Sequence, residues 1–283
     1  MEYAKLSNGL KMPYVGLGTF PLNGEKLTDT IRLACGLGYQ LFDTAGAYEN
    51  ESVLGDALHR YSHDREELFI SSKVNWLQLK GRRRYLYLNR ETVKSAYRHS
   101  CERLGVDQLD LFLLHQPFEG YCEAYLELMH LYDAQKVRAI GVCNCDIDEL
   151  KKLHTRCGVW PMVNQTEISP VNTFKDIIFF CQDNDIQVEA YSPFGRGNIV
   201  SELVNNPILK EIALTHNRTV GQIVLRWIVQ QGIVVIPRST NEQRLKDNMD
   251  VFDFNLDDSE MSSIDSMNEN RVYGVNQINK YDK

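Results

Sequence analysis

Leu109-Asp-Leu-Phe-Leu-Leu-His115 is an apolar run of strand length that ends on an imidazole. Two earlier runs end in the same way, Leu41-Phe-Asp43 on a carboxylate and Leu68-Phe-Ile-Ser-Ser-Lys73 on an ammonium group. Short apolar runs separated by helix-like segments are typical of parallel strands, whose carboxyl ends meet at one edge of the sheet. These runs therefore predict an α/β fold in which each strand delivers one polar group to a common edge.

The same alternation continues along the rest of the chain. The candidate strands are Val15–Leu17, Leu41–Asp43, Leu68–Lys73, Leu109–His115, Val137–Val142, Met162–Gln165, Gln187–Tyr191 and Ile233–Ile236. Helical patterns cover Thr28–Gly36, Ser52–Tyr61, Glu91–Leu104, Ile147–Cys157 and Val220–Gln231, with Asn89, Asp146 and Thr219 as candidate caps of the last three. Strands that alternate with helices predict a parallel sheet, and a count of eight favours a closed (β/α)8 TIM barrel over an open sheet.

The glycines near the N-terminus refine this prediction. Asn8-Gly9 between apolar residues predicts a β-hairpin with a type I′ turn, which we place across the bottom of the barrel. Gly16-Leu-Gly18 has no third glycine at the dinucleotide-fold spacing, so a Rossmann fold is not supported. Because no Pro-, Gly- or Ser-rich linker divides the chain, we expect residues 1–283 to form a single barrel domain.

Composition narrows the class of protein. Hydrophobic residues make up 43% and charged residues 24% of the chain, close to globular averages, so disorder is not expected. A net charge of −7 argues against nucleic acid as the main partner. No apolar run approaches the roughly 20 residues of a membrane span, and no signal-peptide pattern opens the chain. Seven cysteines without a repeated spacing suit a reducing compartment, so we expect a cytoplasmic protein with no membrane partner, monomeric by default.

Asp43, Lys73 and His115 form a plausible proton-transfer set with Tyr48, which lies shortly after Asp43. A phenol acts as an acid near neutral pH only if its neighbours lower its pKa from about 10. The Lys73 ammonium would do so, Asp43 would keep Lys73 protonated, and His115 would orient a carbonyl group. Taken singly, each residue has a structural explanation, but their joint placement at strand ends favours chemistry. Such a site lacks a hydride donor, which implies a nicotinamide cofactor.

The residues around these groups resemble the signatures of the aldo-keto reductase family. The matching segments are Asp43-Thr-Ala-Gly-Ala-Tyr48-Glu-Asn-Glu51, Leu109-Asp-Leu-Phe-Leu-Leu-His115-Gln-Pro117, Lys136-Val-Arg-Ala-Ile-Gly141-Val-Cys-Asn144, Gln165-Thr-Glu167, Tyr191-Ser-Pro-Phe-Gly195 and Ile236-Pro-Arg-Ser239. Their common order along the chain makes the resemblance specific. It implies a (β/α)8 barrel that uses NADPH, with NADH as an alternative, to reduce an aldehyde or ketone to the alcohol. Tyr48 would be the proton donor.

The resemblance also implies a set of cofactor-binding residues. They are Thr19, Asp43, Cys143, Asn144, Gln165, Tyr191, Ser192, Phe194, Arg238, Ser239, Thr240, Arg244 and Asn248. Asn144 and Gln165 would hold the nicotinamide carboxamide, and Tyr191 would stack on the ring. Arg238 and Arg244 would bind the 2′-phosphate of NADPH, because paired guanidinium groups suit bidentate phosphate binding.

The pocket that takes the substrate departs from the family pattern. Its implied residues are Phe20, Tyr48, Trp76, His115 and Gln116. Phe20 and Gln116 each replace a common tryptophan, so one side of the pocket should be more polar than in typical members. Cys143 replaces a serine, and a thiol is a weaker hydrogen-bond donor, so cofactor affinity should be somewhat reduced.

The stretch Asn75–Asn89 is longer and more basic than the family usually places after the lysine strand. One hypothesis is a lid at the barrel mouth that favours a small carbonyl substrate carrying an anionic group. The alternative is a solvated basic loop, since surface charge runs are common.

Two other classes of protein are alternatives to a carbonyl reductase. A non-catalytic barrel that binds NADP(H) as a redox-sensing regulatory subunit would keep the cofactor residues and even the proton-transfer group. A metal-dependent hydrolase would need His and Asp clusters at strand ends, where only His115 fits. Cys143-Asn144-Cys145 has no second cysteine pair, so we expect no metal.

Overall fold

Eight parallel strands pair side by side in the order β3-β4-β5-β8-β9-β10-β11-β12. The computed structural model describes residues 2–62, 64–74, 78–79, 82–83 and 88–271. The paired strands are β3 (Gly16–Gly18), β4 (Leu41–Asp43), β5 (Phe69–Val74), β8 (Leu109–Leu114), β9 (Val137–Cys143), β10 (Val163–Glu167), β11 (Gln187–Tyr191) and β12 (Val234–Ile236). They match the predicted strands one for one, with ends that differ by at most two residues.

The first and last strands close the sheet into a barrel. Val15 bridges Val235 in the parallel sense, and the Val235 N–H donates to the Tyr14 carbonyl over 2.8 Å. Glycine permits this close approach, because a Cβ on Gly18 would lie 2.8 Å from the Ile236 carbonyl oxygen. Gly18 therefore serves barrel closure, whereas a Cβ on Gly16 would meet the Leu41 side chain of the neighbouring strand, and the predicted (β/α)8 fold is confirmed.

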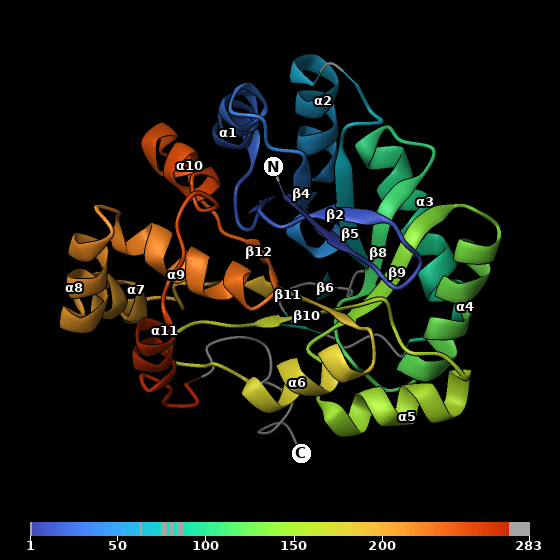
Figure 1. Cartoon of the computed structure of the whole chain (residues 1–283). Coiled ribbons are helices and arrows are strands. Elements are labelled where there is room, and N and C mark those ends of the chain that lie inside the picture. The colour runs from blue at the N-terminus through green and yellow to red at the C-terminus, as the bar shows by residue number, and fades with distance from the viewer. Residues whose placement is uncertain (1, 63, 75–77, 80–81, 84–87, 272–283) are drawn as a thin grey trace.

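Helices surround the strands, as Figure 1 shows. They are α1 (Gly24–Gly36), α2 (Glu51–Tyr61), α3 (Arg90–Leu104), α4 (Tyr121–Asp133), α5 (Ile147–Cys157), α6 (Lys175–Asp183), α7 (Asn198–Asn205), α8 (Pro207–Thr215), α9 (Val220–Gln230), α10 (Glu242–Met249) and α11 (Asp258–Asp265). The predicted caps Asn89, Asp146 and Thr219 are confirmed, each within a capping box. Helix α1 begins earlier than predicted because the Asn23 side chain accepts a hydrogen bond from the Gly24 N–H.

Side chains alternate between two apolar clusters along the central strand β8. In β8, Leu111 and Leu113 belong to a cluster inside the barrel, whereas Phe112 and Leu114 pack between the strands and the helices. This alternation follows from the two-residue period of a strand, and burial on both faces explains why β8 reads as a continuous apolar run.

The N-terminal hairpin packs against the inner cluster. Strands β1 (Tyr3–Lys5) and β2 (Lys11–Pro13) pair antiparallel. The side chains of Met12 in β2 and of Leu6, just after β1, join residues from the first positions of the barrel strands, such as Leu41 and Phe69. The hairpin therefore covers the amino end of the barrel, as predicted, and lies across the strands in Figure 1.

The predicted type I′ turn of this hairpin is wrong. A type I′ turn needs a positive φ at both central residues, but only Gly9 has one, at 86°. Leu6 accepts from the Gly9 N–H over 2.8 Å and donates to the Leu10 carbonyl over 2.9 Å, which leaves residues 7–9 as a three-residue loop. A type I turn that ends in a left-handed glycine accounts for this pattern.

The segment after β5 is described only in part. Residues 78–79 and 82–83 form a short antiparallel ribbon, β6 (Gln78–Leu79) with β7 (Arg82–Arg83). Trp76 and most of the basic stretch 75–89 lie outside the described residues. The lid hypothesis therefore stays a prediction.

Candidate active site

The predicted catalytic residues lie at the carboxyl ends of neighbouring strands. Asp43 ends β4, Lys73 lies near the end of β5, and His115 directly follows β8, while Tyr48 ends a short 3-10 turn, η1 (Gly46–Tyr48), after β4. The Lys73 Nζ donates to both Asp43 carboxylate oxygens over 2.7 Å and to the Tyr48 hydroxyl over 3.4 Å. The structure thus brings the phenol, the amine and the acid into one connected chain.

The pKa shifts of these hydrogen-bonded side chains agree with the prediction for Lys73 but not for Tyr48. Burial is the largest single effect and would lower the pKa of Lys73, but the combined charges of Asp43, Tyr48 and Cys143 and the hydrogen bond to Asp43 hold the Lys73 pKa above its ordinary value, as predicted. Burial raises the pKa of Tyr48 to about 12, although Lys73 acts to lower it. The prediction that its neighbours lower the net Tyr48 pKa is therefore wrong: desolvation of the phenolate exceeds the attraction of the ammonium group.

His115 completes the group from the other side of Tyr48. The two rings meet edge to face with centroids 5.6 Å apart. Burial, and then the Lys73 charge, hold the pKa of His115 well below its usual range. The imidazole is therefore neutral at physiological pH, which suits a hydrogen bond to a carbonyl oxygen.

A second polar layer lies on β9, β10 and β11. The Gln165 Nε2 donates to Asp43 Oδ2 over 3.0 Å and to Glu189 Oε2 over 2.8 Å, which links this layer to the catalytic chain. The Tyr191 hydroxyl donates to Asn144 Oδ1 over 2.8 Å. These polar groups from adjacent strands can hold a planar ring that carries an amide.

The loop after β11 combines several residues of positive φ with an uncapped helix start. Ser192, Gly195 and Gly197 all have positive φ, and α7 begins after Gly197 without a side-chain cap. Turns of this kind point backbone N–H groups into a concave surface that binds phosphate. The Arg196 guanidinium lies 5.6 Å from the Tyr191 ring centroid, and its Nε donates to the Ser192 hydroxyl over 3.0 Å.

The predicted adenosine-phosphate residues lie between β12 and the end of α10. Arg238, Thr240 and Arg244 are exposed, whereas Ser239 and Asn248 are buried. The Arg244 N–H donates to the Asn241 cap of α10, so that arginine lies in the first turn of the helix. Two exposed cations near a helix N-terminus fit a phosphate group.

The remaining predicted residues also lie near the barrel mouth. Phe20 is half exposed, with its ring centroid 5.0 Å from that of Tyr48. Thr19 is buried, and its hydroxyl donates to the Asp43 carbonyl over 2.9 Å.

Cys143 is fully buried, with its Sγ 3.8 Å from Gln165 Oε1. Gln116 is 1% exposed, and neither polar atom of its amide has a hydrogen-bond partner within the described part of the chain.

Three further residues that the sequence did not single out support the site. Glu51, buried at the start of α2, accepts from the Ser72 hydroxyl over 2.6 Å and pairs with Arg103 over 2.6 Å, so it anchors the helix after Tyr48 to β5. Glu189 and Arg196 were also missed. Glu189 is an acid inside a predicted strand, and Arg196 follows a glycine in the predicted phosphate loop, which are the signals that could have found them.

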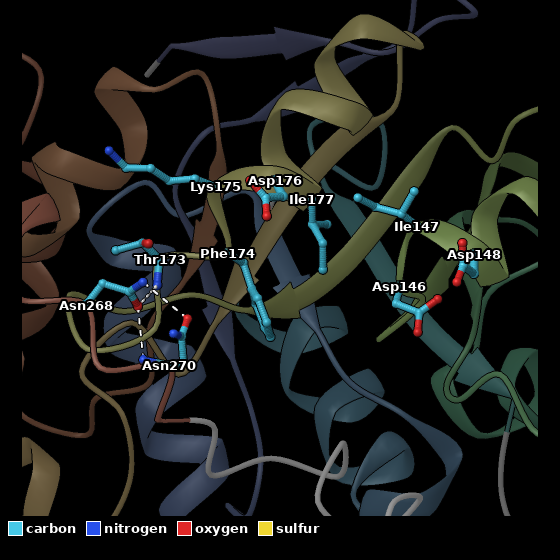
Figure 2. A pocket seen from close by; sticks show the side chains of 10 residues that line it. All are labelled: Asp146, Ile147, Asp148, Thr173, Phe174, Lys175, Asp176, Ile177, Asn268 and Asn270. Atoms are coloured by element: carbon cyan, nitrogen blue, oxygen red, sulfur yellow. Dashed lines mark hydrogen bonds between the residues drawn. The ribbon is translucent and has the colours of Figure 1, made fainter.

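A hollow of about 770 Å³ opens elsewhere on the same rim. It is lined by Asp146, Ile147, Asp148, Thr173, Phe174, Lys175, Asp176, Ile177, Asn268 and Asn270, as shown in Figure 2. The hollow contains none of the predicted site residues. Over the described ranges, no three His, Cys, Asp or Glu side chains gather as metal ligands, and no helix has the length and apolarity to cross a bilayer.

Comparison with known proteins agrees with this geometry. The model of the Aldo/keto reductase family matches residues 14–269. The chain is 41% identical to the uncharacterized oxidoreductase YtbE of Bacillus subtilis over 98% of this chain and 96% of that protein, and 40% identical to the glyoxal reductase of the same organism over 97% and 96%. The crystal structure of a Bombyx mori aldo-keto reductase in complex with NADP superposes with a TM-score of 0.88 at 30% identity, covering 99% and 97% of the two chains.

The closed barrel and the acid, amine, phenol and imidazole at its carboxyl end define a carbonyl oxidoreductase of the barrel type. The chain belongs to the aldo/keto reductase family. The predicted family, fold class and enzyme class are confirmed.

Proposed function

We propose that this enzyme reduces an aldehyde or ketone to the alcohol with NADPH, and that Tyr48 supplies the proton. The observation that carries the proposal is the chain from Tyr48 through Lys73 to Asp43, with the neutral His115 beside it. The imidazole orients the carbonyl oxygen near the phenol. Even with a raised pKa, a phenol is a far stronger acid than an alcohol, so proton transfer to the product alkoxide is favourable.

The residues around Tyr48, Lys73 and Asp43 fit NADPH. The nicotinamide supplies the hydride when bound. Asn144 and Gln165 would bind its carboxamide, Tyr191 would stack on the ring, and Thr19 and Asp43 would contact the ribose. The loop with Ser192 and Phe194 would bind the pyrophosphate, with Arg196 as an added cation. Arg238, Ser239, Thr240, Arg244 and Asn248 would bind the adenosine 2′-phosphate end, where exposed arginines suit that charge.

The proposed substrate is a small polar aldehyde. The glyoxal reductase that is 40% identical supports this class of substrate. The Gln116 amide, next to His115, also supports it, because a buried amide without partners is stabilised by a ligand that offers a second oxygen.

NADPH consumption with glyoxal tests the proposal. The Tyr48→Phe variant should lose roughly 10²- to 10⁴-fold in kcat, the usual contribution of a general acid, while its Kd for NADPH changes little. A wild-type protein that binds NADPH tightly but reduces none of a panel of aldehydes would instead be the redox-sensing subunit. Unchanged turnover in Tyr48→Phe would exclude Tyr48 as the proton donor.

A further inference from the structure

Glu189, in β11, is a fully buried carboxyl group that none of the steps above uses. Its Oε2 accepts the 2.8 Å hydrogen bond from Gln165, and its Oε1 has no partner among the described residues. Burying a carboxyl group that is only half satisfied opposes folding, and such groups gather at functional sites.

The two carboxyl groups that face Gln165 determine which end of its amide points toward them. Its Nε2 donates to Glu189 and also to Asp43, which is itself held by Lys73 and by the Ser71 hydroxyl over 2.8 Å. Ionised carboxylates only accept hydrogen bonds, and an amide oxygen cannot donate one. The amide nitrogen therefore faces the acids, and the amide oxygen, which accepts only from the weak Cys143 thiol donor over 3.8 Å, is the end left for a stronger donor.

We propose that Glu189 is a positioning residue that, together with Asp43, holds the Gln165 amide so that its oxygen receives the NH2 group of the nicotinamide carboxamide. The inference rests on the proposed function, in which Gln165 binds that carboxamide. A reversed Gln165 amide would set one NH2 group against another and remove the hydrogen bond.

The charges around Glu189 make this positioning sensitive to pH. Asp43 from β4, Lys73 from β5 and Cys143 from β9 interact electrostatically with it. Burial and the Asp43 charge raise the pKa of Glu189 to about 8, against the opposing effects of the Gln165 hydrogen bond and Lys73. Below this pKa the neutral acid can also donate, which relaxes the preference of Gln165. Above it, the carboxylate only accepts and enforces the preference.

Direct fluorescence titration of NADPH tests the inference. At pH 9, where Glu189 is ionised, Glu189→Gln should raise the Kd for NADPH roughly fivefold to tenfold, the loss expected for one hydrogen bond, and leave the KM for the aldehyde unchanged. The wild-type Kd should tighten between pH 7 and 9, and Glu189→Gln should lack that component. Glu189→Leu, an apolar replacement of similar volume that buried sites often tolerate, should weaken binding in the same way if Glu189→Gln does not fold.

A double-mutant cycle separates positioning from a general structural role. In a Gln165→Ala background, Glu189→Gln should have no further effect on the Kd, because Glu189 acts through Gln165. Asp110→Asn is the matched control: Asp110 is equally buried and pairs with Arg65 and Arg138, so its loss should lower stability without changing the Kd.

An unchanged Kd and pH profile in both Glu189 variants, or additive effects with Gln165→Ala, would overturn the inference. Failure of the proposed function would give a different result, because the wild-type protein itself would then bind no NADPH or reduce no aldehyde.

Discussion

The amino and carboxyl ends of the barrel are built from the same inward-facing positions with opposite chemistry. At the amino end these positions hold apolar residues such as Leu41 and Val163, which pack against the hairpin residue Met12. Two residues further along the same strands, they hold Asp43 and Gln165, which are buried and hydrogen-bonded. One strand face thus changes from an apolar layer that stabilises the fold to a polar layer that forms part of the proposed active site.

The largest effect expected at the polar end is on the pH dependence of the reverse reaction. In the proposed mechanism, alcohol oxidation needs Tyr48 as the phenolate. Because burial raises the pKa of Tyr48 to about 12, the phenolate fraction should rise about tenfold per pH unit below that value. The oxidation rate should therefore rise about a thousandfold from pH 6 to 9, whereas reduction, which needs the neutral phenol, should stay nearly constant.

Initial rates in both directions over this range measure the effect. A plateau in oxidation that begins below pH 8 would mean that charged neighbours, not burial, dominate the Tyr48 pKa. That result would support the prediction from the sequence that its neighbours lower the net pKa of Tyr48.

The apolar end should respond with stability alone. Met12 is fully buried in the inner cluster, so Met12→Ala should lower the free energy of unfolding by about 2–5 kcal/mol. Its kcat/KM, measured well below the melting temperature, should not change. Met261→Ala in the half-buried α11 position is the control and should destabilise less. A loss of activity per folded molecule in Met12→Ala would show that the two ends are coupled.

The contrast between the ends also explains what could be predicted from the sequence. Strand ends such as Asp43 and His115 were predictable because an apolar run that stops at a polar residue is a local signal. The partnership of Gln165 with Glu189 was not, because it depends on the register between β10 and β11, which local patterns do not encode. The net pKa of Tyr48 was also missed, since desolvation depends on the whole surrounding shell.

Local geometry limited the prediction of the hairpin in a different way. Asn8-Gly9 is compatible with both a two-residue and a three-residue loop, and the pairing of Leu6 with Leu10 decides between them. Trp76 lies outside the described residues, so its predicted substrate contact stays a prediction.

The rim beyond the polar end should determine the choice of cofactor. A double Arg238→Ala, Arg244→Ala change should raise the KM for NADPH roughly 10- to 100-fold, because each charge-assisted hydrogen bond is worth about 1.5–3 kcal/mol and exposure weakens it. The KM for NADH, which has no 2′-phosphate, should change little. Lys246→Ala removes a neighbouring exposed charge on α10 and should leave the ratio of the two KM values unchanged. Equal effects of the arginine changes on both cofactors would refute the assignment.

The smallest effect is expected at Cys143, which lies on the boundary between the two ends. Its side chain belongs to the inner apolar cluster, yet its Sγ lies 3.8 Å from Gln165 Oε1. A hydroxyl is the stronger donor, so Cys143→Ser should tighten NADPH binding by about twofold to fivefold if the side chain serves the polar layer. Fluorescence titration gives the Kd, and thermal unfolding gives the stability of the same samples. Lower stability with an unchanged Kd would assign Cys143 to the apolar layer, because an unpaired hydroxyl there costs folding energy and gains nothing in binding.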